Sequence, residues 1–174
     1  RSVRMAGTKH LRSKSNTLDI GDDAAVIVKG TVARESSVVD KLLNSRYAVL
    51  SAQAFATFRK ESDDAPSKVW PVTKDVVLTD VAGGEYHVRH PGVSTFWAVA
   101  RGAYETRKMW SFTVTWSSVL TTDKLTLAFE TEGKASEWHA GFEKAIQIQE
   151  AMPPKTQARL NELSVGDSSG MRVH

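Results

Sequence analysis

The chain has 174 residues, of which 41% are hydrophobic and 25% charged, enough for one domain with a core but too few for two large domains. It has no cysteine, which excludes disulfide bonds and thiolate metal sites and fits a reducing compartment. Its apolar runs fall far short of the roughly 20 residues that cross a bilayer. The net charge of +3 indicates only a weak preference for anionic partners. We therefore expect a soluble, cytoplasmic protein. Because it begins at Arg1 rather than Met, we also expect a piece of a longer chain.

Residues 1–23 are predicted to be a mostly disordered basic arm. They lack apolar periodicity, and five basic residues precede the first acidic one: Arg1, Arg4, Lys9, Arg12 and Lys14. Two interpretations remain open for this arm: a contact with an anionic surface, or a solvated linker.

Short β-rich segments separated by turn residues follow from Ala24 onward. The clearest is "MWSFTVTW", residues 109–116, whose large apolar side chains alternate with Ser and Thr. Its expected partner is "KLTLAFE", residues 124–130, in which Leu125, Leu127 and Phe129 fall on one face. We predict a tight hairpin at Ala52-Gln53 and a second one at the Gly pair of residues 82–84. The other expected strands are residues 24–35, 45–51, 54–60, 74–81, 85–90 and 95–101.

The last ordered element is predicted to be an amphipathic helix over about 133–152, which Pro153-Pro154 ends. One stripe of this helix is apolar, consisting of Ala135, Trp138, Phe142, Ala145 and Ile146. A helix with a large aromatic residue is suited to close the open end of a strongly bent antiparallel sheet. Trp138 and Phe142 are therefore expected to be structural, and residues 153–174 a mostly disordered tail.

Three segments together resemble a pleckstrin homology (PH) domain: "VKGTVAR", "SRYAVLSAQAFATFRK" and "KLTLAFETEGKASEWHAGFEKAI". The resemblance covers about residues 24–149, and we expect the PH-like domain to span residues 24–152. It implies a mainly β fold, a seven-stranded antiparallel barrel or sandwich capped by one C-terminal α-helix, with Trp138 at the family's tryptophan position. The segment between Lys60 and Met109 is long for this family, and we expect either an inserted hairpin between the third and sixth strands, around residues 82–84, or a lengthened connection.

Strand alternation places two arginines where an anion could bind. Arg34 shares a face of its strand with Val32, and Arg46 shares one with Ala48 and Leu50. If these are the core faces, the two guanidinium groups converge at the barrel mouth and form a donor array suited to phosphate.

The resemblance bears on the same residues. PH domains that bind phosphoinositides use a basic residue late in the first strand, then a basic residue, a spacer and an arginine entering the second. Arg34 and Arg46 match this pattern, whereas Asn44 stands in place of the middle basic residue. Phe58 replaces a tyrosine that is often found in the third strand.

The connection after the first strand has an apolar cluster around Lys41, formed by Val38, Val39, Leu42 and Leu43. Exposed apolar clusters usually mark contact surfaces, so these residues are candidates for dipping into a membrane while Lys41 reaches lipid phosphates. The alternative is that they fold back onto the barrel rim as a short helical turn.

Arg59, with Lys60 and Lys68, is a further candidate for the positive rim of this mouth. Acidic residues are interleaved with these cations, namely Glu61, Asp63 and Asp64, and they cancel much of the field. A solvated loop is therefore the alternative interpretation of this segment.

Other functional classes find little support. Catalytic motifs with nucleophile, phosphate-loop or dinucleotide spacing are absent. His87 and His90 point to opposite faces of a strand, which argues against a metal site. The tryptophans lack the interleaved basic residues of a nucleic-acid stacking surface. We expect no enzyme activity, no cofactor, no metal and no nucleic-acid partner.

The leading hypothesis is a non-catalytic membrane-targeting module, peripheral at a membrane. Anionic phospholipid or phosphoinositide headgroups would be held by Arg34, Lys41, Arg46 and Arg59. The alternative is a protein-interaction or regulatory module on the same barrel, partnered by another protein or an adjacent domain, with little or no lipid binding.

Overall fold

The computed structural model describes residues 25–36, 40–90, 93–94, 97, 100–117 and 121–153. The predicted basic arm and nearly all of the predicted tail lie outside the described residues, as do Val38 and Val39. Within the described part, the strands are β1 Val26–Glu35, β2 Leu42–Ser51, β3 Ala54–Phe58, β4 Lys68–Pro71, β5 Val77–Leu78, β6 Ala82–Arg89, β7 Tyr104–Ser117 and β8 Thr122–Phe129. The helix α2 spans Glu132–Ala151. The mainly β fold with one C-terminal helix is thus confirmed.

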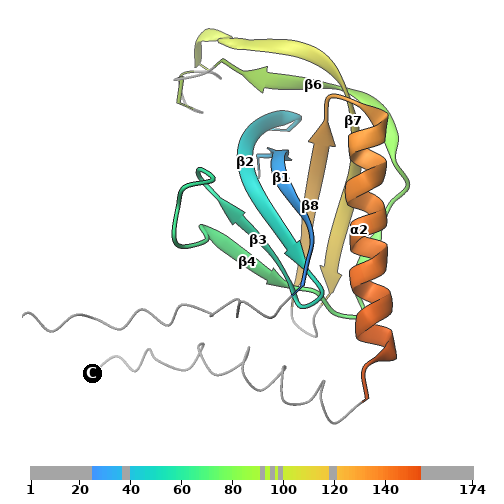
Figure 1. The fold of residues 1–174 in the computed structure, drawn as a ribbon. Helices are drawn as coiled ribbons and strands as arrows, with labels where there is room; N and C mark the ends of the chain where they lie inside the picture. The colour runs from blue at the N-terminus through green and yellow to red at the C-terminus, as the bar shows by residue number, and fades with distance from the viewer. Residues whose placement is uncertain are drawn as a thin grey trace, which may run out of the picture.

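The strands form one sheet in the order β1-β8-β7-β6-β2-β3-β4, and an additional pairing of β1 with β2 closes part of it into a barrel. Most neighbours are antiparallel. The exception is a short parallel contact in which Leu42 and Leu43 of β2 lie opposite His87 and Val88 of β6. In Figure 1, β3 and β4 lie on one side of β1 and β2, and α2 runs along the other side, beside β7 and β8.

The hairpin at Ala52-Gln53 is confirmed, and Ser51 explains how it forms without an Asn-Gly turn. The buried hydroxyl of Ser51 accepts hydrogen bonds from the amides of Gln53 (3.3 Å) and Ala54 (3.1 Å). The side-chain amide of Gln149 in α2 donates to the carbonyl of Ala52 at 2.6 Å. The turn is therefore tied to the last part of the helix.

The hairpin predicted at residues 82–84 is wrong. These residues belong to β6 and lie opposite Met109–Ser111 of β7, while the two-residue β5 pairs with β7 further along. A Cβ atom at Gly84 would lie 3.2 Å from Cε2 of Tyr86, because the Tyr86 ring covers this position. The absence of a side chain at Gly84 therefore leaves room for the Tyr86 ring, and Gly84 does not form a turn.

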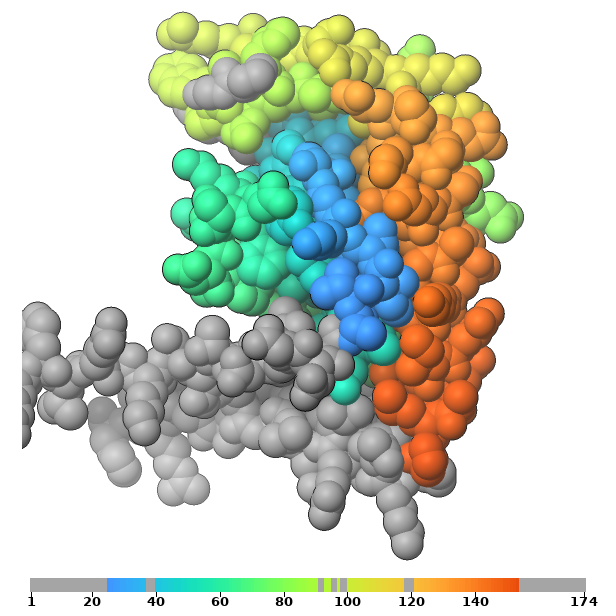
Figure 2. Space-filling view, in the orientation of Figure 1, coloured from blue at the N-terminus to red at the C-terminus, as the bar shows by residue number. Residues whose placement is uncertain are grey.

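The main core lies between the sheet and α2. Trp138 (2% exposed) and Phe142 (fully buried) pack against Phe55, with ring centroids 6.2 and 5.2 Å away. A Cβ atom at Gly141 would lie 2.9 Å from Cγ1 of Val28, so glycine permits the close approach of helix and sheet here. The expected structural role of Trp138 and Phe142 matches this packing. Figure 2 shows α2 covering one side of the molecule.

A second, smaller core lies within the ring of strands β1-β8-β7-β6-β2. It consists of Leu43, Met109 and Ala128, with Ala33, Tyr86 and Val88 packed against them. The Tyr86 hydroxyl lies 2.7 Å from the Ser111 hydroxyl and anchors this cluster to β7. In Figure 1 the β6–β7 hairpin crosses above β1 and β2. Its residues Met109, Tyr86 and Val88 contribute to this core.

The placement of Leu42 and Leu43 in a membrane-contacting loop is therefore corrected. Both residues begin β2 and are only 1% and 2% exposed. Both leucines pair with β6, and the side chain of Leu43 packs in a cluster with Met109 of β7, against which Tyr86 and Val88 of β6 lie. In this fold neither leucine is available to a membrane.

Candidate functional site

The strand alternation brings Arg34 and Arg46 to one face, as predicted. Val32 pairs with Arg46 across β1 and β2, and Arg34 pairs with Asn44 two residues further along. Val32 is 1% exposed and belongs to the main core, so its face is the core face. Arg34 and Arg46 continue this face beyond the apolar packing, at the mouth of the barrel.

Arg34 is half-buried at the mouth of the barrel. Among the described residues, neither Arg34 nor Arg46 has a carboxylate within ion-pairing distance. Burial lowers the pKa of the Arg34 guanidinium, and the nearby positive charge of Arg46 lowers it further. The Arg34 guanidinium makes a cation–π contact with Trp70, whose ring centroid lies 5.8 Å from Cζ of Arg34.

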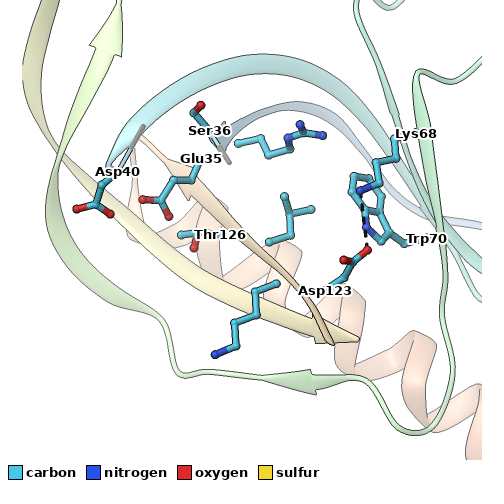
Figure 3. Close-up of a pocket in the computed structure, with 10 residues that line it drawn as sticks. Glu35, Ser36, Asp40, Lys68, Trp70, Asp123 and Thr126 are labelled. Carbon is cyan, nitrogen blue, oxygen red and sulfur yellow. Dashed lines mark ion pairs between the residues drawn. The ribbon is translucent and has the colours of Figure 1, made fainter. Parts of the chain in front are cut away.

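A cavity of about 470 Å³ opens beside Arg34. Figure 3 shows side chains from three parts of the sheet around it: the end of β1 with the following connection, β4, and the start of β8. Its lining residues are Arg34, Glu35, Ser36, Asp40, Lys68, Trp70, Asp123, Lys124, Leu125 and Thr126. Its volume falls in the range of about 300–1,000 Å³ that small-molecule sites occupy.

One end of this cavity is organised around Trp70. The Lys68 ammonium lies 4.6 Å from the Trp70 ring centroid and 3.9 Å from the Asp123 carboxylate. This contact joins β4 to β8 across the mouth, but both side chains are more than half exposed, so it contributes little to stability. A second link between β4 and the β7–β8 hairpin is the Trp116 indole N–H, which donates to the Pro71 carbonyl at 2.9 Å.

The connection between β1 and β2 is held by backbone contacts of Lys41. The Lys41 amide donates to Oε1 of Glu35 at 2.7 Å, and the Lys41 carbonyl accepts from the His87 amide at 2.8 Å. The backbone of Lys41 is left-handed, with φ 56°, which is unfavourable for a residue with a side chain. Lys41 is exposed on the rim, near the cavity but not in its lining.

The four predicted headgroup residues therefore do not all lie at the cavity. Arg34 lines the cavity, Arg46 lies beside Arg34, and Lys41 lies on the adjoining rim. Arg59 is exposed on the β3–β4 connection and is not part of the cavity lining. Lys68 of β4, a rim candidate in the sequence, lines the cavity, whereas the contributions of Trp70 and of β8 were not predicted. For β4, the alternation that puts Lys68 and Trp70 on one face was an available signal.

Two departures from the phosphoinositide-binding pattern have structural explanations. Asn44 lies opposite Arg34, where a third basic side chain would add to the repulsion between Arg34 and Arg46. Phe58 pairs with Tyr47, their ring centroids 6.3 Å apart, on the face opposite to that of Arg46. A hydroxyl at position 58 would therefore not face the mouth.

Metal binding and membrane spanning find no structural basis in the described part of the chain. No group of three or more His, Asp or Glu residues there could hold a metal ion. His87 instead lies against Tyr104, with ring centroids 4.5 Å apart, and its Nδ1 is 3.2 Å from the Thr106 hydroxyl. None of the described helices is both long and apolar enough to cross a bilayer.

Comparison with known proteins shows the fold. No family model matches the sequence, and a search of curated proteins found no match. Among solved structures, the chain resembles the PH domain of human pleckstrin homology domain-containing protein family A member 5, with 14% identity and a TM-score of 0.50, covering 85% of this chain and 98% of that one.

Two further solved structures are similar at lower TM-scores. The PH domain of human KIAA0053 protein has 16% identity and a TM-score of 0.48, with 73% of this chain and 93% of that one covered. The Slm1 PH domain in complex with phosphoserine has 14% identity and a TM-score of 0.47, with 70% and 96% covered. On the likeness to the family A member 5 domain, the chain has a PH-like fold.

Proposed function

We propose that this chain is a non-catalytic membrane-targeting module whose barrel mouth binds the phosphate of an anionic phospholipid headgroup. The observation that carries this proposal is the pair formed by Arg34 and Arg46. They lie at the mouth on one face, without a carboxylate partner among the described residues.

A bound phosphate would offset two effects that are unfavourable for the charged Arg34 side chain, its desolvation and its repulsion by Arg46. Arg34 is partly desolvated and is repelled by Arg46, so an oxyanion between them would compensate both charges. Guanidinium groups also present several N–H donors in a planar fork that fits phosphate oxygens. The cavity beside Arg34 gives a headgroup room to enter.

The expected affinity is modest. The cavity lining contains as many acidic as basic side chains, so it does not attract polyanions strongly. Lys41 on the rim is exposed, and each basic side chain near an anionic membrane contributes only about 1 kcal/mol. Stable recruitment would then need a second contact, for which the basic residues of 1–23 are candidates.

The test is co-sedimentation of the protein with neutral and anionic vesicles. Because a hydrogen bond to a charged group is worth about 1.5–3 kcal/mol, we expect Arg46→Ala to weaken binding to anionic vesicles by about tenfold or more. Lys29→Ala is the matched control, since it also removes one positive charge but from an exposed side chain on the other face of β1. Equal binding by a folded Arg46→Ala protein and by wild type would refute the headgroup site.

A second candidate is a protein-interaction module, favoured by the charge balance of the cavity and by the edge of β4. Within the described residues β4 pairs only with β3, so its other edge is open to an added peptide strand. Lipid binding through Arg34 and Arg46 should fall steeply as salt rises, whereas strand addition at β4 should be less sensitive to salt and to both arginines.

A further inference from the structure

The cavity beside Arg34 is lined by three basic and three acidic side chains, and two of the acidic ones, Glu35 and Asp40, lie apart from Arg34 and Lys68 (Figure 3). In Figure 3, Lys68 and Trp70 gather at one end with Asp123, and Glu35 and Asp40 lie at the other. The contact distances agree, because Arg34 and Lys68 both approach the Trp70 ring, at 5.8 and 4.6 Å. We call the end with Arg34, Lys68 and Trp70 the cationic end, and the end with Glu35 and Asp40 the acidic end.

The charges at the two ends do not neutralise each other within the described residues. Arg34 has no ion pair there, and the one at the cationic end, Lys68 with Asp123, is long and exposed. At the acidic end, Glu35 accepts only a backbone hydrogen bond, from Lys41, and Asp40 is exposed without an ion pair. Each end therefore retains capacity for a ligand group of opposite charge.

A ligand that carries only negative charge fits this arrangement poorly. An inositol polyphosphate large enough to fill the cavity would place phosphate groups beside Glu35 and Asp40, where like charges repel. A small phosphate monoester would use the cationic end alone and leave both carboxylates uncompensated. The best match carries phosphate at one end and a positively charged group at the other.

We propose, on the basis of the headgroup site proposed above, that the cavity selects a headgroup with a primary ammonium beside its phosphate, with phosphatidylserine as the preferred lipid. The phosphate lies at Arg34 and Arg46, and the ammonium donates to Glu35 and Asp40. The cationic end favours phosphatidylserine over phosphatidylethanolamine, because Arg34, Arg46 and Lys68, even after the negative charge of Asp123 is subtracted, exceed the charge of one phosphodiester. The serine carboxylate supplies the second anion.

The test compares vesicles of equal surface charge, containing either phosphatidylserine or phosphatidylglycerol, which lacks an ammonium. We expect the wild-type protein to bind the phosphatidylserine vesicles several-fold more tightly. A vesicle set with phosphatidylinositol bisphosphate at the same total charge should bind no better than phosphatidylglycerol.

The decisive variant is Glu35→Gln with Asp40→Asn. The amide oxygen that replaces the Glu35 carboxylate can still accept the Lys41 amide, so the connection keeps its hydrogen bond while both charges are lost. If only overall charge matters, this protein binds every anionic vesicle more tightly. We expect opposite changes instead: weaker binding to phosphatidylserine, and unchanged or tighter binding to phosphatidylglycerol.

Two controls complete the experiment. Glu137→Gln with Glu150→Gln removes the same charge from exposed positions of α2 and should leave the phosphatidylserine preference intact. Soluble glycerophosphoserine should displace the protein from phosphatidylserine vesicles, whereas glycerophosphate at the same concentration should not. Displacement by both equally would reveal a plain phosphate site and overturn the inference.

The outcomes separate the two proposals. Binding to all anionic vesicles in proportion to charge, lost in Arg46→Ala, would keep the headgroup site but refute the ammonium selection. No binding to any vesicle by folded protein would refute both. Phosphatidylserine preference that disappears in the Glu35→Gln/Asp40→Asn protein but survives in the helix control would support both.

Discussion

The two ends of the barrel share strands β1 and β8 but differ in packing, charge and hydrogen bonding. At the end that α2 covers, Leu50 and Phe55 are fully buried with Phe142, and aromatic rings fill the space. At the mouth, the core face of β1 passes from Val32, which is 1% exposed, to the half-buried Arg34 in a single alternation step. Side-chain alternation thus determines which face of the strand a residue lies on. Its position along the strand then determines whether it packs in the core or is available to a ligand.

The two ends also differ in how their polar groups are satisfied. At the covered end, Gln149 and Ser51 are buried with their hydrogen bonds made to the β2–β3 turn. At the mouth, Arg34 has no carboxylate partner within the described residues. The covered end therefore supplies stability, and the mouth keeps charge available for a ligand. Substitutions at the two ends should change different observables.

The largest effect is expected at the covered end, for Trp138→Ala. Trp138 stacks on Phe129 at 6.1 Å and contacts Phe55 edge-on, so its removal leaves a cavity under the helix. We expect the free energy of unfolding to fall by about 3 to 5 kcal/mol, measured by urea denaturation followed by far-UV circular dichroism.

The matched control for this substitution is Trp97→Ala. The Trp97 side chain is 49% exposed, and its contact with Arg101 lies at the surface. Because surface substitutions usually change stability little, we expect a loss below about 1 kcal/mol. A similar loss in both variants would contradict the assignment of Trp138 as the helix anchor.

The covered end could largely be predicted from the sequence, because its signals are local. The apolar stripe through Trp138 and Phe142 and the alternation in residues 109–116 each follow one element's own period. The tight hairpin at Ala52-Gln53 was also found, although its cause, the Ser51 hydroxyl, was not recognised.

The mouth was predictable only in part, because strands far apart in the chain build it. Alternation placed Arg34 and Arg46 on one face, but no local pattern shows that Lys68 of β4 meets Asp123 of β8. The same limit explains the error at Leu42 and Leu43, since the covering strand β6 is distant in the sequence, with His87 and Val88 as their partners. Long-range pairing determines which side chains share a cavity.

A smaller effect of opposite sign is expected at the mouth, for Arg34→Met. Methionine keeps an unbranched side chain beside Trp70 while removing a half-buried charge that Arg46 repels. We expect stability to rise by at most about 1 kcal/mol, because the remaining exposure lets water screen the charge. Binding to anionic vesicles should nevertheless be lost, so stability and binding would move in opposite directions.

Urea denaturation and vesicle co-sedimentation of the same Arg34→Met preparation test this prediction. Val32→Ala is the comparison on the same face of β1, where a buried methyl pair is removed instead of a charge. It should lower stability by about 1 to 3 kcal/mol and leave binding by the remaining folded protein unchanged. Retained vesicle binding by Arg34→Met would remove Arg34 from the proposed site.

The smallest effect is expected at Lys41, on the rim of the mouth. Its backbone is left-handed, with φ 56°, so glycine should relieve strain there, although glycine also gains entropy in the unfolded chain. We expect Lys41→Gly to raise the free energy of unfolding by about 0.5 kcal/mol.

Lys41→Ala removes the same charge but keeps the strain, so its stability should match that of wild type. Since both lose the ammonium, both should weaken vesicle binding by the same small factor. If only one of them did, the rim would act through the conformation of the β1–β2 connection rather than through the charge of Lys41.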